Sequence, residues 1–223
     1  MQSTPIDYLR PDVPGELPWV EVPLVPATAS SLRGFGRVVE DYRNFPVEIV
    51  RWPAQGWRPV DPGTGDEAGT TKGTFECWWE GDILMGRNGA VGGEYLLGWA
   101  NNPVKAVREV SRCEPQPRVL LWHANYHPDG GQLFYPLDGK PFVVPLALPG
   151  DDVRPEKFVA FLVDGNHGLY IHPNVWHEGI FPMEGRGRFY DEQGKVHARV
   201  SCNIAREFGV FLAVPLTVAS PLL

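Results

Sequence analysis

The stretch RVLLWHANYHPDGGQLFYPLDGKPFVVPLAL, residues 118–148, decides the fold class. It contains three apolar runs, 118–127, 132–137 and 140–148, which are separated by the turn sequences PDGG and DG. Runs of this length that are rich in β-branched and aromatic residues and bounded by Gly, Pro and Asp are typical of β-strands. The stretch therefore predicts consecutive strands joined by tight turns.

The composition extends this prediction to the whole chain. The 223 residues include 23 prolines and 25 glycines, which together exceed a fifth of the sequence and are spread along it. Such frequent helix breakers leave little room for long helices and favour many short strands. We therefore predict an all-β fold, a sandwich or a barrel, with 43% hydrophobic residues available for its core.

Further elements are expected on both sides of this stretch. Strands are expected at 47–52, 74–86, 94–100, 158–165, 168–172 and 208–216, and in two runs of 188–205 around a turn at Gln193 and Gly194. Two short peripheral helices are expected at 27–42, capped by Ser30 or Ser31, and at 101–112, with Pro103 in the first turn.

The ends of the pattern suggest how the chain is organised. Residues 1–26 carry six prolines and predict an extended arm that lies on the body of the protein or on a partner subunit. Residues 27–223 are expected to form one domain. Within it, residues 61–73, DPGTGDEAGTTKG, are expected to form a loop, and His197 is expected at an exposed strand position.

Charge and cysteine content narrow the classes of function. The net charge of −7 and the lack of a basic run argue against a nucleic-acid partner. No apolar segment approaches the ~20 residues that cross a bilayer, and the polar N-terminus does not resemble a signal peptide. Cys77, Cys113 and Cys202 have unrelated spacings that fit neither a zinc site nor a disulfide framework. We expect reduced thiols in a cytoplasmic protein.

Two histidines flank a predicted corner in GLYIHPNVWHEGIFP, residues 168–182. The spacing suits a strand that ends at His172, a corner at Pro173 and Asn174, and a second strand that begins near Trp176. Asn tolerates the left-handed backbone conformation that such a corner requires. Both imidazoles can therefore point into one concavity.

A second polar group lies on one predicted strand. His123, Asn125 and His127 alternate, and a period of two places them on one face. The turn HPDGGQ then begins the next strand at Gln132, close to His127. Polar groups that converge within apolar surroundings are what a small-molecule pocket in the mouth of a barrel requires.

The arrangement resembles a cupin, and one cupin family in particular. Its marks are a His-Pro turn leading to Gln, a Phe-x-Pro strand, a Gly-x-x-Tyr strand and an Asn-Val-Trp-His corner. The corresponding places in this chain are His127-Pro128, Gln132, Phe134 with Pro136, Gly168 with its neighbours to Ile171, and Asn174-Val175-Trp176-His177. With these motifs the sequence resembles the ureidoglycolate lyase family, well over 118–182 and loosely over 30–216.

The resemblance implies a cupin-type β-barrel, a homodimer and a role in allantoin and purine catabolism. It also implies the cleavage of a carbinolamide C–N bond without water, which yields glyoxylate and urea. This reaction needs a base for the hydroxyl proton and an acid for the departing nitrogen. Histidines suit both roles because their ordinary pKa of ~6.5 lies near neutral pH.

The cupin pattern also bears on cofactors. Its four ligand slots fall on Asn125, His127, Gln132 and His177, and carboxamides are weak ligands for transition metals. No cofactor is therefore expected. If a divalent transition metal is present, His127 and His177 together with His123 and His172 are its candidate ligands.

These inferences define the expected site. His127 and His177 are the candidate acid and base, and Gln132 is expected to orient the substrate. The residues expected to contact the substrate are His172, His123, Asn125, Tyr126 and Trp176. Asn125 and Tyr126 stand where the family usually has an acidic residue and an arginine, so we expect a shift towards a less charged acid, amide or ester. Two alternatives are a metal-dependent cupin isomerase or oxygenase and a non-catalytic ligand-binding cupin.

Overall fold

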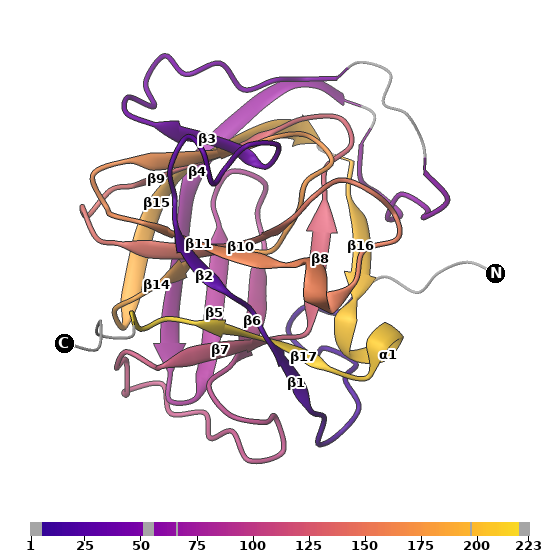
Figure 1. The fold of residues 1–223 in the computed structure, drawn as a ribbon, viewed down its shortest axis with the longest axis vertical. Helices are drawn as coiled ribbons and strands as arrows, with labels where there is room; N and C mark the ends of the chain where they lie inside the picture. The colour runs from indigo at the N-terminus through magenta and orange to yellow at the C-terminus, as the bar shows by residue number, and fades with distance from the viewer. Residues whose placement is uncertain (1–5, 51–55, 66, 197, 219–223) are drawn as a thin grey trace.

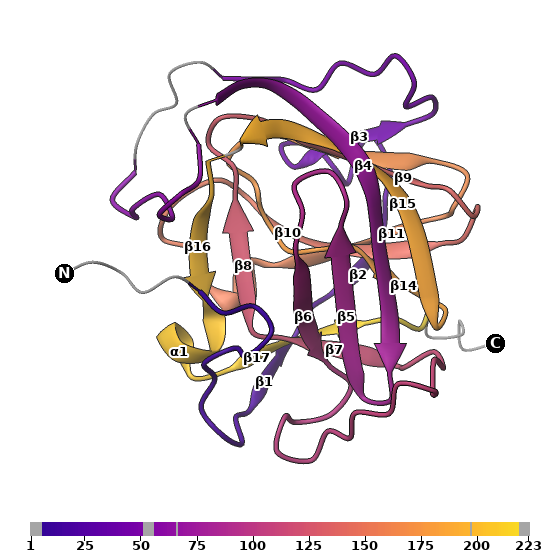
Figure 2. The same ribbon diagram turned by 180° about the vertical axis from the view of Figure 1, so that it is seen from behind.

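A computed structural model describes residues 6–50, 56–65, 67–196 and 198–218 of the protein. The strands of this part of the chain form two β-sheets (Figure 1). The first has ten strands, in the order β1 (Trp19–Glu21), β17 (Phe211–Pro215), β7 (Arg118–Leu121), β6 (Glu94–Trp99), β5 (Ile83–Asn88), β4 (Glu67–Glu80), β15 (Arg186–Val196), β9 (Gln132–Pro136), β12 (Gly168–Ile171) and β3 (Gly36–Val39). Figure 2 shows its hairpin strands β4, β5 and β6 side by side.

The second sheet packs against the first. Its order is β16 (Val200–Asn203), β8 (His123–Tyr126), β13 (Trp176–His177), β10 (Phe142–Ala147), β11 (Val159–Val163) and β2 (Leu24–Pro26), with β14 (Phe181–Pro182) also paired to β10. The helical elements of the described residues are α1 (Ile204–Phe208) and a 3₁₀ turn at Pro155–Lys157. The predicted all-β, cupin-type architecture is confirmed.

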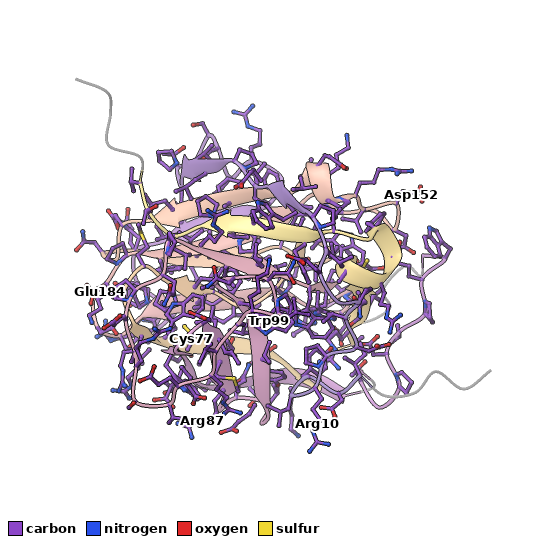
Figure 3. The ribbon with its side chains drawn as sticks, turned by 90° about the horizontal axis from the view of Figure 1, so that it is seen from below. Arg10, Cys77, Arg87, Trp99, Asp152 and Glu184 are labelled. Carbon is purple, nitrogen blue, oxygen red and sulfur yellow. The ribbon has the colours of Figure 1, made fainter. Side chains whose placement is uncertain are left out.

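The core lies between the two sheets. Every side chain of β10 is buried, as expected for an apolar run without alternation. The rings of Phe142 on β10 and Phe189 on β15 lie 5.1 Å apart, which joins the two layers. Cys77 is buried in this core and lies well inside the outline of Figure 3, whereas Arg10, Arg87, Asp152 and Glu184 lie at the periphery. Cys77, Cys113 and Cys202 are free thiols.

The predicted strand 118–127 is divided between the two sheets. β7 pairs with β17 and β6 in the first sheet, and β8 pairs with β16 and β13 in the second. The chain passes between them at Trp122, whose indole N–H donates to Leu96 O at 3.1 Å. This crossover brings His123, Asn125 and His127 to the second sheet.

The two predicted helices are wrong. In 27–42 a single turn, in which Leu32 N–H donates to Thr28 O, is followed by β3. Gly34 has φ 86°, which ends the turn, and Gly36 lies directly against Tyr170 of the neighbouring strand. Sheet pairing therefore overrides local helix propensity here.

The second helix fails for a related reason. One turn forms after Asn102, and Arg108 then bridges to Gly81 in an antiparallel contact. Val107 N–H donates to the carboxylate of Asp82 at 3.0 Å. Backbone groups of the segment 101–112 thus bind to the β4–β5 hairpin. They are not available for the internal hydrogen bonds of a helix.

The predicted turn at Gln193 and Gly194 is also wrong, because both residues lie inside β15. They pair with Thr71 and Thr70 of β4, so the expected loop 61–73 is strand from residue 67 onward. The strand expected at 47–52 is reduced, in its described part, to a bridge between Ile49 and Gly130. His197 lies outside the described residues.

Residues 6–26 of the predicted arm lie on the body of their own chain, whereas residues 1–5 lie outside the described part. β1 pairs in parallel with β17, and β2 pairs in parallel with β11, so the arm adds an edge strand to each sheet. Near its start, Tyr8 O accepts a hydrogen bond from Leu96 N–H at 2.8 Å. No described helix is long and apolar enough to span a bilayer.

Candidate active site

The predicted corner is present, but it brings His177 together with His127 and not with His172, the expected partner. Asn174 has φ 67°, and its N–H donates to His127 O at 3.0 Å. The corner leads into β13, where His177 pairs with Asn125 of β8. The imidazole rings of His127 and His177 consequently lie 4.9 Å apart.

A small cavity opens beside this pair. Its volume is about 60 Å³, and a water molecule needs roughly 10–15 Å³ on the same measure, so it has room for a molecule of a few non-hydrogen atoms. The polar residues that line it include Asn125, His127, Gln132, His177, Glu178 and Arg199. Four of these six, Asn125, His127, Gln132 and His177, were predicted as site residues.

Both ring nitrogens of His177 contact oxygen atoms. Nδ1 lies 2.8 Å from Val175 O, and Nε2 lies 3.1 Å from Oε1 of Gln132. Burial lowers the pKa of His177 below its ordinary value, because a charged ring would lose its hydration. The Nδ1 atom of His127 lies 3.1 Å from Ala198 O, to which it donates its proton. In a neutral ring the basic nitrogen of His127 is therefore Nε2.

A buried carboxyl group that the sequence reasoning missed lies behind Gln132. Asp191 on β15 has no exposed surface, and its Oδ1 accepts from the Gln132 amide at 2.9 Å. Its Oδ2 accepts from Asn88 at 2.9 Å and from Gln193 at 2.7 Å. Burial raises the pKa of Asp191 to about 6 despite these three donors.

A pattern in the sequence could have indicated this residue. Phe189, Asp191 and Gln193 alternate along β15 and are all buried, so the acid occupies an inward position. The turn wrongly expected at Gln193 and Gly194 interrupted this alternation. A charged residue in phase with core residues is a signal of a site, because a buried charge is costly unless it is paired.

Glu178 and His123 form a second pair that the sequence did not predict. Nδ1 of His123 lies 2.5 Å from Oε2 of Glu178. Glu178 lines the cavity, whereas His123 does not and lies behind it, 1% exposed. The predicted contact residue His123 therefore reaches the cavity through Glu178.

The cavity also has a cation and a phenol. Arg199 precedes β16, which lies beside β8 (Figure 1), and its Nε donates to Asp61 at 2.8 Å. The guanidinium lies 4.8 Å from the centre of the Tyr8 ring, within the range of a cation–π contact. Tyr8 comes from the arm, so no local motif could have placed it here.

Three predicted contact residues lie away from the cavity. Tyr126 follows the cavity residue Asn125 on β8, and Trp176 precedes the cavity residue His177 on β13. Because successive side chains of a strand point to opposite faces, both face the other side of the sheet. There the Tyr126 hydroxyl donates to Asp151 at 2.7 Å, and the Trp176 indole donates to Gly150 O at 2.7 Å. His172 packs edge-on against Tyr170 with ring centres 5.5 Å apart, and burial together with Arg37 lowers its pKa.

The candidate metal ligands do not converge. Within the described ranges, no group of three or more His, Cys, Asp or Glu side chains is arranged to hold a metal ion. His172 lies outside the cavity lining, and the ring nitrogens of His177 contact Val175 and Gln132.

Comparison with known proteins finds a similarity to one enzyme family over just under half of the chain. Residues 97–204 match the ureidoglycolate lyase family. The predicted resemblance is confirmed, and the matched segment includes every predicted site residue, together with Glu178, Asp191 and Arg199.

Individual relatives agree with the family match. A ureidoglycolate lyase of Pseudomonas aeruginosa is 43% identical over 89 residues, which is 40% of this chain and 52% of the relative. Those of Azotobacter vinelandii and Pseudomonas savastanoi pv. phaseolicola are 38% identical over 74 residues and 36% identical over 86 residues. These alignments cover 33% and 38% of this chain and 44% and 51% of the relatives. The chain thus spans about half the length of the curated relatives that it matches.

Proposed function

We propose that the protein is a carbon–nitrogen lyase that cleaves ureidoglycolate, or a closely related carbinolamide acid, into glyoxylate and urea. The observation that carries the proposal is the gathering of His127, Gln132, His177 and Arg199 at one cavity within the family-matched segment. The relatives named above are ureidoglycolate lyases. The small cavity suits a substrate of few non-hydrogen atoms.

His127 is the proposed acid–base residue. Its Nδ1 is held by Ala198 O, so Nε2 takes the proton of the substrate hydroxyl group. As the hydroxyl carbon becomes a carbonyl, the C–N bond breaks, and the same proton is delivered to the departing nitrogen. His177 supports this step by holding Gln132, whose amide orients the substrate through hydrogen bonds.

Arg199 is the proposed contact for the substrate carboxylate. A guanidinium has five N–H donors, and Asp61 engages the one at Nε. In this chain Tyr126 occupies the position where the family usually has an arginine, and its side chain faces away from the cavity. Arg199 would supply the positive charge for the substrate carboxylate instead. The substrate can therefore keep its carboxylate, which revises the expected shift to a less charged ligand.

A product assay tests the proposal. Purified protein is incubated with ureidoglycolate after treatment with EDTA, and glyoxylate, urea and ammonia are measured. We expect glyoxylate and urea in equal amounts, without ammonia. His127→Gln should abolish most turnover, whereas the matched control His172→Gln should not. Binding without turnover would support the non-catalytic alternative, and activity restored only by added metal would support the metal-dependent one.

The biological setting follows from the same proposal. We propose a cytoplasmic enzyme of allantoin and purine catabolism that acts as a homodimer and needs no cofactor. Val104, Val107 and Val110 are 62%, 58% and 71% exposed, and such exposed apolar residues are available for contacts in a dimer. A solution mass near the 24.8 kDa of one chain would contradict the dimer.

A further inference from the structure

The hydrogen-bond network behind the cavity constrains its protons. Both nitrogens of His177 face oxygen atoms, Val175 O at 2.8 Å and Oε1 of Gln132 at 3.1 Å. A backbone carbonyl oxygen and an amide oxygen both accept hydrogen bonds and cannot donate them. Both contacts are therefore hydrogen bonds only if each ring nitrogen of His177 carries a proton. A doubly protonated ring is cationic, and burial opposes that charge.

The other end of the network fixes where a proton can sit on Asp191. The orientation of the Asn88 amide is anchored because its Oδ1 accepts from the N–H groups of Ala90 at 2.8 Å and Val91 at 3.3 Å. Its Nδ2 therefore donates to Oδ2 of Asp191 at 2.9 Å. A proton on Asp191 must then lie on Oδ1, which faces Gln132.

Gln132 lies between these two groups, and its amide can be turned by 180° without a change of shape. In one arrangement His177 is a cation, Gln132 accepts from it, and the Gln132 amide donates to a charged Asp191. In the other, protonated Asp191 donates to Oε1 of Gln132, and the amide donates to Nε2 of a neutral His177, whose Nδ1–H still donates to Val175 O. Both arrangements satisfy every contact, have the same net charge and differ by one moved proton.

If that proton is lost altogether, one contact always fails. A charged Asp191 needs the amide N–H₂ of Gln132, and a neutral His177 with its proton on Nδ1 needs the same group. Whichever way the amide points, two acceptors then face each other in a buried position, which is unfavourable. The network thus opposes loss of this proton, in keeping with the raised pKa of Asp191.

We propose that Asp191 and His177 share a single proton through Gln132, and that the resting protein holds it on Asp191. The neutral arrangement avoids two separated buried charges, each of which would be costly. It places the amide N–H₂ of Gln132 towards His177 and its oxygen towards Asp191. Asp191 is therefore a positioning residue that acts on the substrate through Gln132. Its role in catalysis rests on the function proposed above.

The charged neighbours of the pair do not change this assignment. Glu178 raises the pKa of His177 and His123 lowers it, while Glu192 raises that of Asp191. For both groups burial is the largest influence, and it favours the uncharged form of each.

Two spectroscopic measurements on the substrate-free protein test the proposal, so its outcome is independent of any turnover. Nitrogen-15 NMR of histidine-labelled protein at pH 5, below the pKa of Asp191, with His177 assigned by loss of its signals in His177→Gln, should show a neutral ring protonated at Nδ1. Infrared spectroscopy should show a protonated carboxyl band that disappears in Asp191→Asn. A doubly protonated His177, or no carboxyl band assignable to Asp191, would overturn the proposal.

Asp191→Asn also supplies a matched variant. An asparagine there accepts from Asn88 through its oxygen and donates to Gln132 through its amide, as the protonated acid does. The His177 signals should therefore be unchanged in Asp191→Asn, whereas Asp191→Leu, which offers Gln132 no donor, should shift them. A His177 ring that loses a proton in Asp191→Asn would show that the wild-type pair is ionised. If Asp191→Asn or Asp191→Leu does not fold, the wild-type nitrogen-15 spectrum, assigned through His177→Gln, still gives the protonation state of His177.

Discussion

Replacing Asp191 by asparagine should make the protein relatively more stable as the pH rises. The carboxyl has its ordinary pKa of 3.8 when the chain is unfolded, and burial raises it to about 6 in the folded protein. Between these values the folded state binds more protons than the unfolded state. Stability of the wild type therefore falls as pH rises through this range. Asp191→Asn cannot titrate, so it lacks this loss.

The size of the effect follows from the same two values. They differ by about 2, and one pKa unit corresponds to about 1.4 kcal/mol, so the difference is ~3 kcal/mol. Asp191 is fully buried, so solvent screening does not reduce it. Relative to the wild type, Asp191→Asn should gain ~2 kcal/mol in unfolding free energy between pH 4 and pH 7, because the unfolded carboxyl is already partly ionised at pH 4.

Urea unfolding of both proteins at a series of pH values measures this difference. The exposed Asp164 provides a control, because a hydrogen bond from His167 lowers its pKa. Asp164→Asn should therefore show no such gain, and any change should have the opposite sign. Parallel pH curves for wild type and Asp191→Asn would refute the argument that burial holds a proton on Asp191.

Other predictions concern the cavity and the fold. His127→Gln should lower kcat by ~10²-fold or more while the melting temperature changes little, because it removes the acid–base group and keeps a donor for Ala198 O. Equal losses in His172→Gln would contradict the placement of His172 outside the cavity. Arg199→Gln should raise KM for a carboxylate substrate ~10-fold or more, checked against a neutral amide analogue that should be unaffected. Gly36→Ala should destabilise the fold by ~2 kcal/mol or more, since a Cβ would lie 1.9 Å from Tyr170 O, whereas Gly15→Ala, with its nearest atom at 3.9 Å, should not; equal urea midpoints for the two would count against this packing.

Much of the site could be predicted from local sequence. The alternation that carries Asn125 and His127, and the Asn174 corner that carries His177, depend on backbone geometry within a few residues. The same alternation, applied strictly, would have placed Tyr126 and Trp176 on the opposite face. Family motifs over 118–182 agree with the matched segment 97–204.

The rest depends on contacts between distant parts of the chain. Arg199 and Tyr8 reach the cavity, and Asp191 lies behind it against Gln132, because β15, the residues before β16 and the N-terminal arm come together there. The chain from 101 to 112 becomes an edge segment, and not a helix, because the β4–β5 hairpin satisfies its backbone groups. Sequence determines periodicity and turn chemistry, which are local. Burial, which sets the pKa of Asp191 and His177, depends on which distant segments cover them, and only the tertiary structure decides that.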